Sequence, residues 1–204
     1  MSYPSQNHFD YFLKLNIVGK GCVGKTSLLE RFCMDYFDEK MGLLIGVDFR
    51  IKEMEVDNKL IKCQVWDLGA RSERFSRRSP TSREYLRGSK GLIILYDITF
   101  SDTFDIIKTF IKEINENGPP DVKKILVGTK CDLEDKRQVT EEQGKKLADE
   151  LVINFFEVSA KTGKNVNEAF SSLVREIIKD YKEPKPTILI KEEKDKGKDH
   201  KCTK

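Results

Sequence analysis

The residues with the most specific chemistry lie together in one short loop near the N-terminus. They match the phosphate-binding pattern G-x-x-x-x-G-K-[ST], and they are Gly19, Lys20, Gly21, Cys22, Val23, Gly24, Lys25 and Thr26. Glycines in this pattern let backbone N–H groups turn towards an anion, and a helix that starts there adds partial positive charge. Lys25 is placed to reach the outer phosphates as a catalytic group, and the Thr26 hydroxyl is placed to bind Mg²⁺. The alternative is a Gly-rich turn that matches by chance.

The segments on either side of the loop favour the phosphate site. Residues 12–18 form an apolar run typical of a strand, and residues 27–32 have the composition of the first turns of a helix. A strand before the loop and a helix after it are the context that this motif needs. We therefore expect a phosphate site, with Ser27 as a further nucleotide contact.

Strand patterns recur along the rest of the chain. Residues 46–56 have the period-2 pattern of a half-exposed strand, and residues 60–67 return from a turn at 57–59 to complete a hairpin. Continuous apolar runs, typical of parallel strands covered on both faces, follow at 91–97, 124–129 and 152–158.

Amphipathic helices are expected between these strands. One covers about 102–117, one starts at Thr140 with Gln143 completing a capping box, and one starts at Asn165 with Glu168 three residues later. The alternation predicts an α/β fold with a mostly parallel sheet and one antiparallel edge. In such sheets ligands bind at the carboxyl ends of the strands, where each polar motif falls.

The composition fits one intracellular domain. The 204 residues include 38% hydrophobic ones, without an apolar run near the roughly 20 residues of a membrane helix and without a signal peptide at residues 1–7. The five cysteines form no C-x-x-C pair, so a zinc site is not expected. Scattered free thiols are typical of a protein in a reducing compartment. A net charge of +3 is too small to indicate nucleic-acid binding, and the tail at 182–204 accounts for all of it with eight lysines against five acidic residues.

Two carboxylates after strands could complete the site. Asp67 can hold Mg²⁺ opposite Thr26, or it can be a solvent-facing carboxylate at a strand end. Asp132 can accept hydrogen bonds from the N1–H and the 2-amino group of guanine, a pair of donors that adenine lacks. The Lys130 stem is placed to lie along the base. A backbone amide of residues 159–161 is placed to contact the guanine 6-oxo group.

With these motifs the chain resembles the Rab branch of the Ras superfamily of small GTPases over about residues 9–180. Besides the phosphate loop, the matching segments are Ile45-Gly46-Val47-Asp48-Phe49, Trp66-Asp67, Glu73-Arg74-Phe75, Arg87-Gly88, Leu95-Tyr96-Asp97-Ile98-Thr99, Lys130-Cys131-Asp132-Leu133 and Val158-Ser159-Ala160-Lys161. The resemblance implies a P-loop NTPase G domain at 9–181, with a six-stranded sheet and helices on both faces. The composition of residues 182–204, with two prolines and many Lys, Asp and Glu residues, predicts a disordered tail.

The resemblance also implies GTP/GDP and Mg²⁺ binding, GTP hydrolysis, and partners in vesicle traffic: effectors, exchange factors and GTPase-activating proteins. The base-binding positions that it implies are Thr129, Lys130, Asp132, Leu133, Ser159, Ala160 and Lys161. Phe37 aligns with an aromatic that packs edge-on against guanine, although it could equally be a core residue at a helix end. An aromatic effector triad aligns with Phe49, Trp66 and Tyr85, which are otherwise ordinary half-buried aromatics.

The two switch segments depart from the family pattern. Leu44 occupies the position of the Thr that binds Mg²⁺ and senses the γ-phosphate, and it has no oxygen to offer. The D-T-A-G-Q-E segment is replaced by residues 67–73, in which Ala70 takes the place of the sensing glycine and Arg71 or Ser72 that of the water-positioning Gln. Because phosphoryl transfer rests on positioning, we expect slow or absent intrinsic hydrolysis.

Other departures affect the loop, the base motif and the tail. Thr129 replaces Asn, which predicts weaker nucleotide binding, and Cys22 replaces a Gly, where its side chain either crowds the phosphates or points away. The basic insert within 76–83 is either a surface for an acidic partner or headgroup or a solvated loop. Cys202 is a candidate for prenylation, although the chain ends one residue short of C-a-a-X.

The main hypothesis is a divergent Rab-like GTPase in the cytoplasm or on the cytoplasmic face of endomembranes, with peripheral membrane contact. One alternative is a scaffold that keeps the fold and binds fixed partners without switching. Another is a different P-loop enzyme, such as a metabolite kinase, for which the sequence offers no acceptor-site residues.

Overall fold

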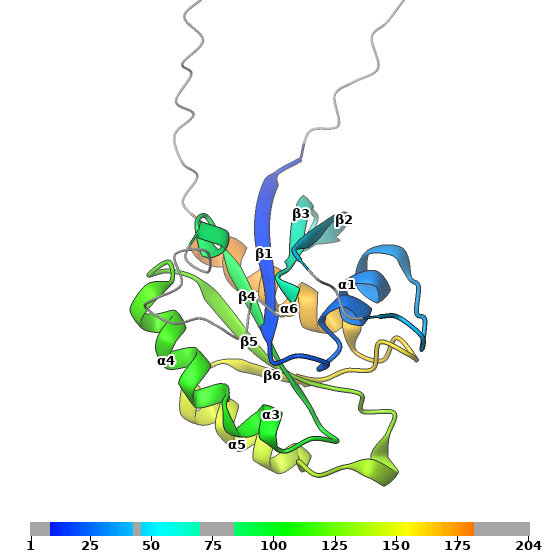
Figure 1. Ribbon diagram of the computed structural model, residues 1–204. Coiled ribbons are helices and arrows are strands. Elements are labelled where there is room, and N and C mark those ends of the chain that lie inside the picture. Colours follow the sequence, from blue (N-terminus) through cyan, green and yellow to red (C-terminus); the bar gives the residue numbers. More distant parts are fainter. Residues whose placement is uncertain (1–8, 43–45, 70–83, 182–204) are drawn as a thin grey trace, which may run out of the picture.

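The computed structural model describes residues 9–42, 46–69 and 84–181, and the side chain of Asn117 is not described. Within these ranges six strands form one sheet in the order β2-β3-β1-β4-β5-β6 (Figure 1). The strands are β1 (Tyr11–Gly19), β2 (Asp48–Val56), β3 (Lys59–Asp67), β4 (Gly91–Asp97), β5 (Lys123–Thr129) and β6 (Asn154–Glu157). All neighbouring pairs are parallel except β2 and β3, so the predicted mostly parallel sheet with one antiparallel edge is confirmed.

Helices cover both faces of this sheet, as predicted. They are α1 (Lys25–Met34), α3 (Asp102–Asp105), α4 (Ile107–Asn117), α5 (Glu141–Leu151) and α6 (Val166–Asp180). In Figure 1, α1 and α6 lie on one face, and α3, α4 and α5 lie on the other. No helix in the described ranges is both long and apolar enough to span a bilayer.

Side chains that alternate along β1 enter two separate apolar cores. Leu13, Leu15 and Ile17 pack with α1 and α6, whereas Val18 packs with β4 and the helices of the opposite face. Residues 91–97 of β4 are buried throughout, as the continuous apolar run predicts for a central parallel strand. The sheet is therefore a rigid base that brings the ends of several strands to one edge.

The expected hairpin forms around a two-residue turn. Asp57 and Asn58 have φ angles of 51° and 59°. Two consecutive left-handed residues are typical of the type I′ turn, whose twist suits a hairpin, and Asn and Asp tolerate this conformation. Lys59, expected in the turn, already belongs to β3.

Two of the expected elements differ from the structure. The single helix expected over 102–117 is two helices, because Ile106 turns towards the bridge region with ψ of −7° and separates α3 from α4. The last strand starts at Asn154 and not at Val152, which is left-handed and ends α5. Val152 is 90% exposed, so the prediction that its apolar side chain starts a buried strand is wrong.

Only one of the two expected helix caps is present. Thr140 caps α5 with the full capping box, since its hydroxyl accepts from the Gln143 N–H and the Gln143 side chain accepts from the Thr140 N–H. Asn165 precedes α6 in a left-handed conformation without a side-chain cap. Its amide instead donates to the Glu157 carbonyl at 2.8 Å and so ties the start of α6 to the end of β6.

Candidate nucleotide-binding site

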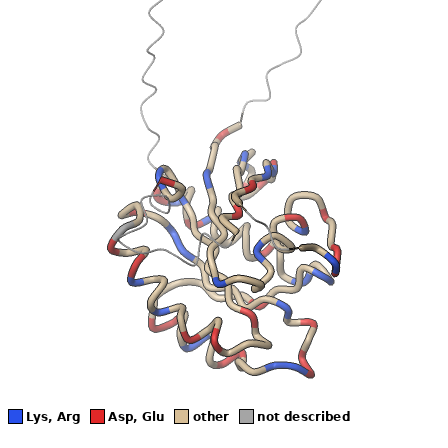
Figure 2. Tube along the Cα trace, in the orientation of Figure 1, with Lys and Arg blue, Asp and Glu red and all other residues tan. Residues whose placement is uncertain are grey.

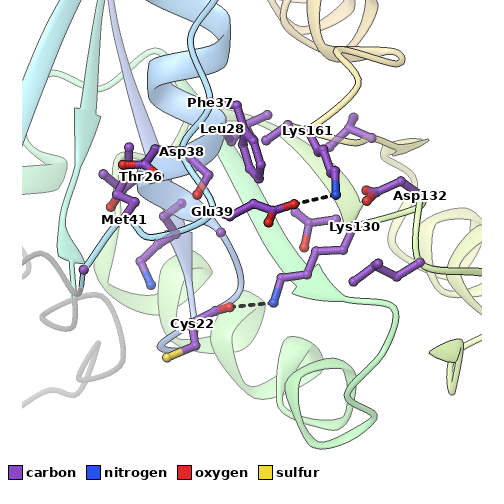
Figure 3. Close-up of a pocket in the computed structure, with 18 of the residues that line it drawn as sticks. Cys22, Thr26, Leu28, Phe37, Asp38, Glu39, Met41, Lys130, Asp132 and Lys161 are labelled. Carbon is purple, nitrogen blue, oxygen red and sulfur yellow. Dashed lines mark hydrogen bonds and ion pairs between the residues drawn. The ribbon is translucent and has the colours of Figure 1, made fainter.

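A cavity of about 470 Å³ opens where the loops after β1, β5 and β6 meet (Figure 3). The predicted site residues that line it are Gly21, Cys22, Gly24, Lys25, Thr26, Ser27, Phe37, Thr129, Lys130, Asp132, Leu133, Ala160 and Lys161. The predicted residues that do not line it are Gly19, Lys20, Val23, Asp67 and Ser159, and several of these contact residues that do. The cavity lies at the carboxyl ends of the strands, where the sequence predicts the ligand site.

Two glycines give the phosphate loop its shape. Gly24 has a φ of 89°, a left-handed conformation that side chains rarely adopt, directly before α1 begins at Lys25. A Cβ on Gly19 would lie 2.7 Å from the Leu95 carbonyl oxygen, so the loop starts with a close approach to β4. Among the described residues no side chain caps α1, which leaves its N-terminal partial charge for an anion.

The ammonium group of Lys25 is held inside this loop. Lys25 is 6% exposed, and its Nζ donates to the carbonyl oxygens of Gly19 at 3.0 Å and Lys20 at 2.7 Å. A buried cation held by the loop's own backbone is in place for a phosphate that enters the cavity.

The two residues expected to hold Mg²⁺ are in contact. The Thr26 hydroxyl donates to Oδ2 of Asp67 at 2.5 Å, and the Gly69 N–H donates to Oδ1 at 2.8 Å. Asp67 is fully buried, which excludes the solvent-facing alternative. A hydroxyl and a carboxylate are hard oxygen ligands of the kind that Mg²⁺ prefers, and Mg²⁺ normally completes its shell with phosphate and water oxygens.

The carboxylate of Asp132 is oriented at the far end of the cavity. The Ser159 hydroxyl donates to Oδ1 of Asp132 at 2.6 Å and accepts from the Thr162 N–H at 3.1 Å. Ser159 is fully buried and therefore supports Asp132 from behind. The loop after β6 thus positions the carboxylate that follows β5.

Lys130 and Thr129 connect the base end to the phosphate loop. The Lys130 Nζ donates to the Cys22 carbonyl at 3.1 Å and forms an ion pair with Asp97 at 2.5 Å. The buried Thr129 hydroxyl lies 2.7 Å from the Val23 carbonyl oxygen and 3.0 Å from that of Tyr96. Thr129 therefore holds the phosphate loop against the sheet.

Cys22 fits the loop without filling it. It adopts a left-handed φ of 62° and is exposed. In Figure 3 its sulfur points away from the other labelled residues. Of the two alternatives for Cys22, the structure agrees with a side chain that points away.

The opposite wall of the cavity comes from the segment after α1. Phe37 lines the cavity and is half-buried, and Asp38, Glu39 and Met41 line the cavity as well. Glu39 forms an ion pair with Lys161 at 2.5 Å, a contact that raises the pKa of Lys161 mainly through its hydrogen bond (Figure 3).

Some lining residues carry no signal in the sequence. Leu28, Asp38, Glu39, Met41 and Gly42 line the cavity without belonging to any of the predicted site motifs, and Gly69 and Val158 belong to such segments without having been assigned to the site. They reach it because α1 and the strand ends place them there, which only tertiary structure reveals.

The three residues of the expected effector triad lie together outside the cavity. The Phe49 and Trp66 rings stack at 4.9 Å between centroids, and the Tyr85 ring lies 6.4 Å from Trp66. The Lys14 ammonium lies 5.0 Å from the centre of the Trp66 ring. The remaining candidates, Leu44, Arg71, Ser72, Cys202 and the insert at 76–83, lie outside the described residues.

The charges of the described part are mixed over the surface (Figure 2). Positions of both signs occur along α4 and α5 and in the loops around the cavity.

The fold and the cavity together define a P-loop nucleotide-binding protein of the G-domain type. Residues 14–179 match the family model described as the Ras family. The chain is 47% identical over 175 residues to GTP-binding protein ypt2 of Schizosaccharomyces pombe, an alignment that covers 86% of each chain.

Two further relatives agree with this match. Identity to Ras-related protein Rab-8B of Homo sapiens is 46% over 170 residues, which cover 83% of this chain and 80% of the relative. Identity to Ras-related protein Rab-13 of Rattus norvegicus is 41% over 201 residues, which cover 96% and 97%. The chain therefore belongs to the Rab family of small GTPases.

Proposed function

We propose that this protein binds GTP and GDP with Mg²⁺ and recruits effectors in vesicle traffic, with slow or absent intrinsic GTP hydrolysis. The observation that supports the nucleotide most directly is that Lys25, Thr26 and Asp132 border one cavity. The first two suit phosphate and metal, and the third suits a guanine edge.

Each contact has a chemical role in this proposal. Lys25 and the amides of the loop bind the phosphates, and Thr26 and Asp67 are the protein ligands of Mg²⁺, which neutralises phosphate charge when bound. Asp132 accepts from guanine N1–H and the 2-amino group, with Ser159 holding it in place. The Lys130 stem lies along the base, and the Ala160 amide meets the 6-oxo group.

The proposal of slow hydrolysis rests on the switch sequences. Arg71 or Ser72 takes the position of the Gln that positions the attacking water. The Arg guanidinium only donates, and the Ser hydroxyl, which can donate and accept, is a much shorter group than the Gln amide. Leu44 offers no oxygen to Mg²⁺ or to a γ-phosphate sensor. A GTPase-activating protein could supply a missing group in trans.

Partner binding is assigned to the aromatic triad. Phe49 is 42% exposed and stacks on Trp66, and large aromatics of this kind dominate the energetics of protein interfaces. Together with Tyr85 they form a preformed apolar anchor for an effector.

The tail is proposed to bring the G domain to the cytoplasmic face of endomembranes. Each lysine near an anionic membrane adds about 1 kcal/mol, and acidic residues in the tail offset part of this. Contact of this strength is transient unless Cys202 is prenylated. The basic insert at 76–83 is a second candidate surface for an acidic partner or headgroup.

A non-switching scaffold is the second candidate, and Leu44 is the observation that favours it. Without an oxygen at that position, the first switch no longer responds to the γ-phosphate. Pull-downs with GDP-loaded and GTP-analogue-loaded protein separate the two, because a switch shows a strong preference for one state and a scaffold shows none.

The decisive experiment identifies the nucleotide that co-purifies and then times a single turnover of GTP. We expect GDP or GTP in the purified protein and little product formation over the time in which an ordinary Rab converts its GTP. Turnover at an ordinary Rab rate contradicts slow hydrolysis. A purified protein that carries adenine nucleotide contradicts the guanine assignment.

A further inference from the structure

The mouth of the cavity is bridged by an ion pair between two distant segments. Glu39 lies in the segment that follows α1, and Lys161 lies in the loop after β6. Their side chains point towards each other in Figure 3, and the carboxylate and ammonium groups are 2.5 Å apart. Both residues line the cavity, so this contact joins opposite walls at the guanine end.

Arg31 supports both sides of this bridge from α1. Its Nε donates to the Ala160 carbonyl at 2.6 Å, and its Nη2 donates to the Lys161 carbonyl at 3.1 Å. Its Nη1 donates to Asp35, to the backbone oxygen at 2.9 Å and to the carboxylate at 2.7 Å. One guanidinium therefore fixes the loop that carries Lys161 and the start of the segment that carries Glu39.

The bridge depends on no phosphate group. The phosphate loop contacts Lys25 and Lys130, whereas the ion pair lies beside Phe37 and Asp132 at the other end. We expect a nucleotide that leaves the cavity to pass beside this bridge or to open it. Leu44, by contrast, cannot make the γ-phosphate-dependent contact that its position implies.

We propose that Glu39 and Lys161 form a clasp over the bound nucleotide that slows the release of GDP and GTP equally. This inference rests on the proposed guanine nucleotide site and adds the residue pair that controls release. Glu39 is a positioning residue here, because it acts through Lys161 and through closure of the segment after α1. The clasp closes from the base side and is therefore indifferent to the γ-phosphate.

The ionic character of the clasp limits its strength. Both side chains are more than half exposed, Lys161 at 52% and Glu39 at 66%. Exposed pairs of this kind change an equilibrium by a factor of roughly 1.5 to 5 and are screened by salt. A clasp of this strength adjusts the lifetime of the complex without locking it.

The test compares the release of fluorescent GDP and of a fluorescent non-hydrolysable GTP analogue from wild type, Glu39→Gln and Glu150→Gln. Glu150 on α5 is the matched control, since Gln removes the same charge there from an exposed ion pair with Lys108 at 2.8 Å, and neither of these two residues lines the cavity. Glu39→Gln should release both nucleotides about two to five times faster at low salt, and Glu150→Gln should match wild type. In 1 M NaCl the difference between Glu39→Gln and wild type should disappear.

Three outcomes overturn the clasp while leaving the nucleotide site intact. They are an unchanged release rate in Glu39→Gln, an equal change in Glu150→Gln, and an effect on the GTP analogue alone. A wild-type protein that shows no saturable uptake of either nucleotide refutes the proposed function itself, and the clasp with it.

Discussion

The hydroxyl of Thr26 and the carboxylate of Asp67 lie 2.5 Å apart, although 41 positions separate them in the sequence. Thr26 belongs to the first turn of α1, and Asp67 is the last residue of β3. The parallel pairing of β1 and β3, which sets Ile17 opposite Asp67, brings the two together. The Gly69 N–H holds the other carboxylate oxygen, so the pair is ready to accept a cation.

Removal of the Thr26 hydroxyl should abolish the dependence of nucleotide binding on Mg²⁺. In Thr26→Ala only Asp67 remains as a protein ligand, so chelation of Mg²⁺ should no longer accelerate nucleotide release. The measurement is the release rate of fluorescent GDP with and without EDTA. Thr26→Ser keeps the hydroxyl and should respond to EDTA like wild type. An Ala variant that still responds as strongly as wild type would refute the assignment of Thr26.

Asp132→Asn should exchange guanine for xanthine specificity. The amide offers one acceptor and one donor, which suits the N1–H and 2-oxo groups of xanthine, whereas guanine presents two donors. Loss of a hydrogen bond to a charged group costs about 1.5–3 kcal/mol, so GDP should bind about 10- to 150-fold more weakly. Competition of GDP and XDP against a fluorescent nucleotide measures both effects. GDP affinity equal to that of wild type would exclude Asp132 from the base site.

Thr129→Val should destabilise the folded protein through the phosphate loop. The substitution keeps the shape but removes the hydroxyl that contacts the carbonyl oxygens of Val23 and Tyr96. A buried acceptor without its partner costs about 1–3 kcal/mol. Urea unfolding should show this loss of free energy of unfolding at an unchanged m-value. A free energy of unfolding equal to that of wild type would show that the hydroxyl contact to the loop does not stabilise the fold.

The sequence predicted the parts of the site that local chemistry specifies. Each strand end and its polar motif were expected, because apolar runs and the Gly-rich loop are local signals. The supports were not: Arg31 reaches Ala160 across 129 positions, and Ser159 orients Asp132 across 27. Such contacts depend on which strand ends become neighbours, and a single sequence does not encode that directly.

Local signals also failed where tertiary contacts dominate. Val152 is β-branched and apolar, yet it ends α5 at the surface in a left-handed conformation. Asn16, in the middle of β1, is a buried amide that accepts from the Ser89 hydroxyl and donates to the Tyr85 carbonyl at 3.3 Å. The sequence around Asn16 does not indicate these two hydrogen bonds, because the partner residues come from a segment some 70 positions away.

The thiols should differ sharply in reactivity. Burial raises the pKa of Cys33 to about 11 and that of Cys63 to about 12, so at pH 8 both remain protonated and unreactive. Cys22 is exposed at the phosphate loop and should be alkylated before Cys33 and Cys63 by iodoacetamide. Mass spectrometry of timed samples resolves the sites, and urea should make Cys33 and Cys63 reactive. Modification of Cys63 as fast as Cys22 in the folded protein would contradict this order.

The most direct test of the central claim is a calorimetric titration of nucleotide-stripped, folded protein with GDP, GTP and ADP in Mg²⁺ buffer. The geometry of Lys25, Thr26 and Asp132 predicts saturable one-to-one binding of both guanine nucleotides, with ADP at least about a hundredfold weaker because adenine lacks the two donors that Asp132 accepts. Absence of saturable guanine nucleotide binding, or ADP binding of equal strength, would contradict it.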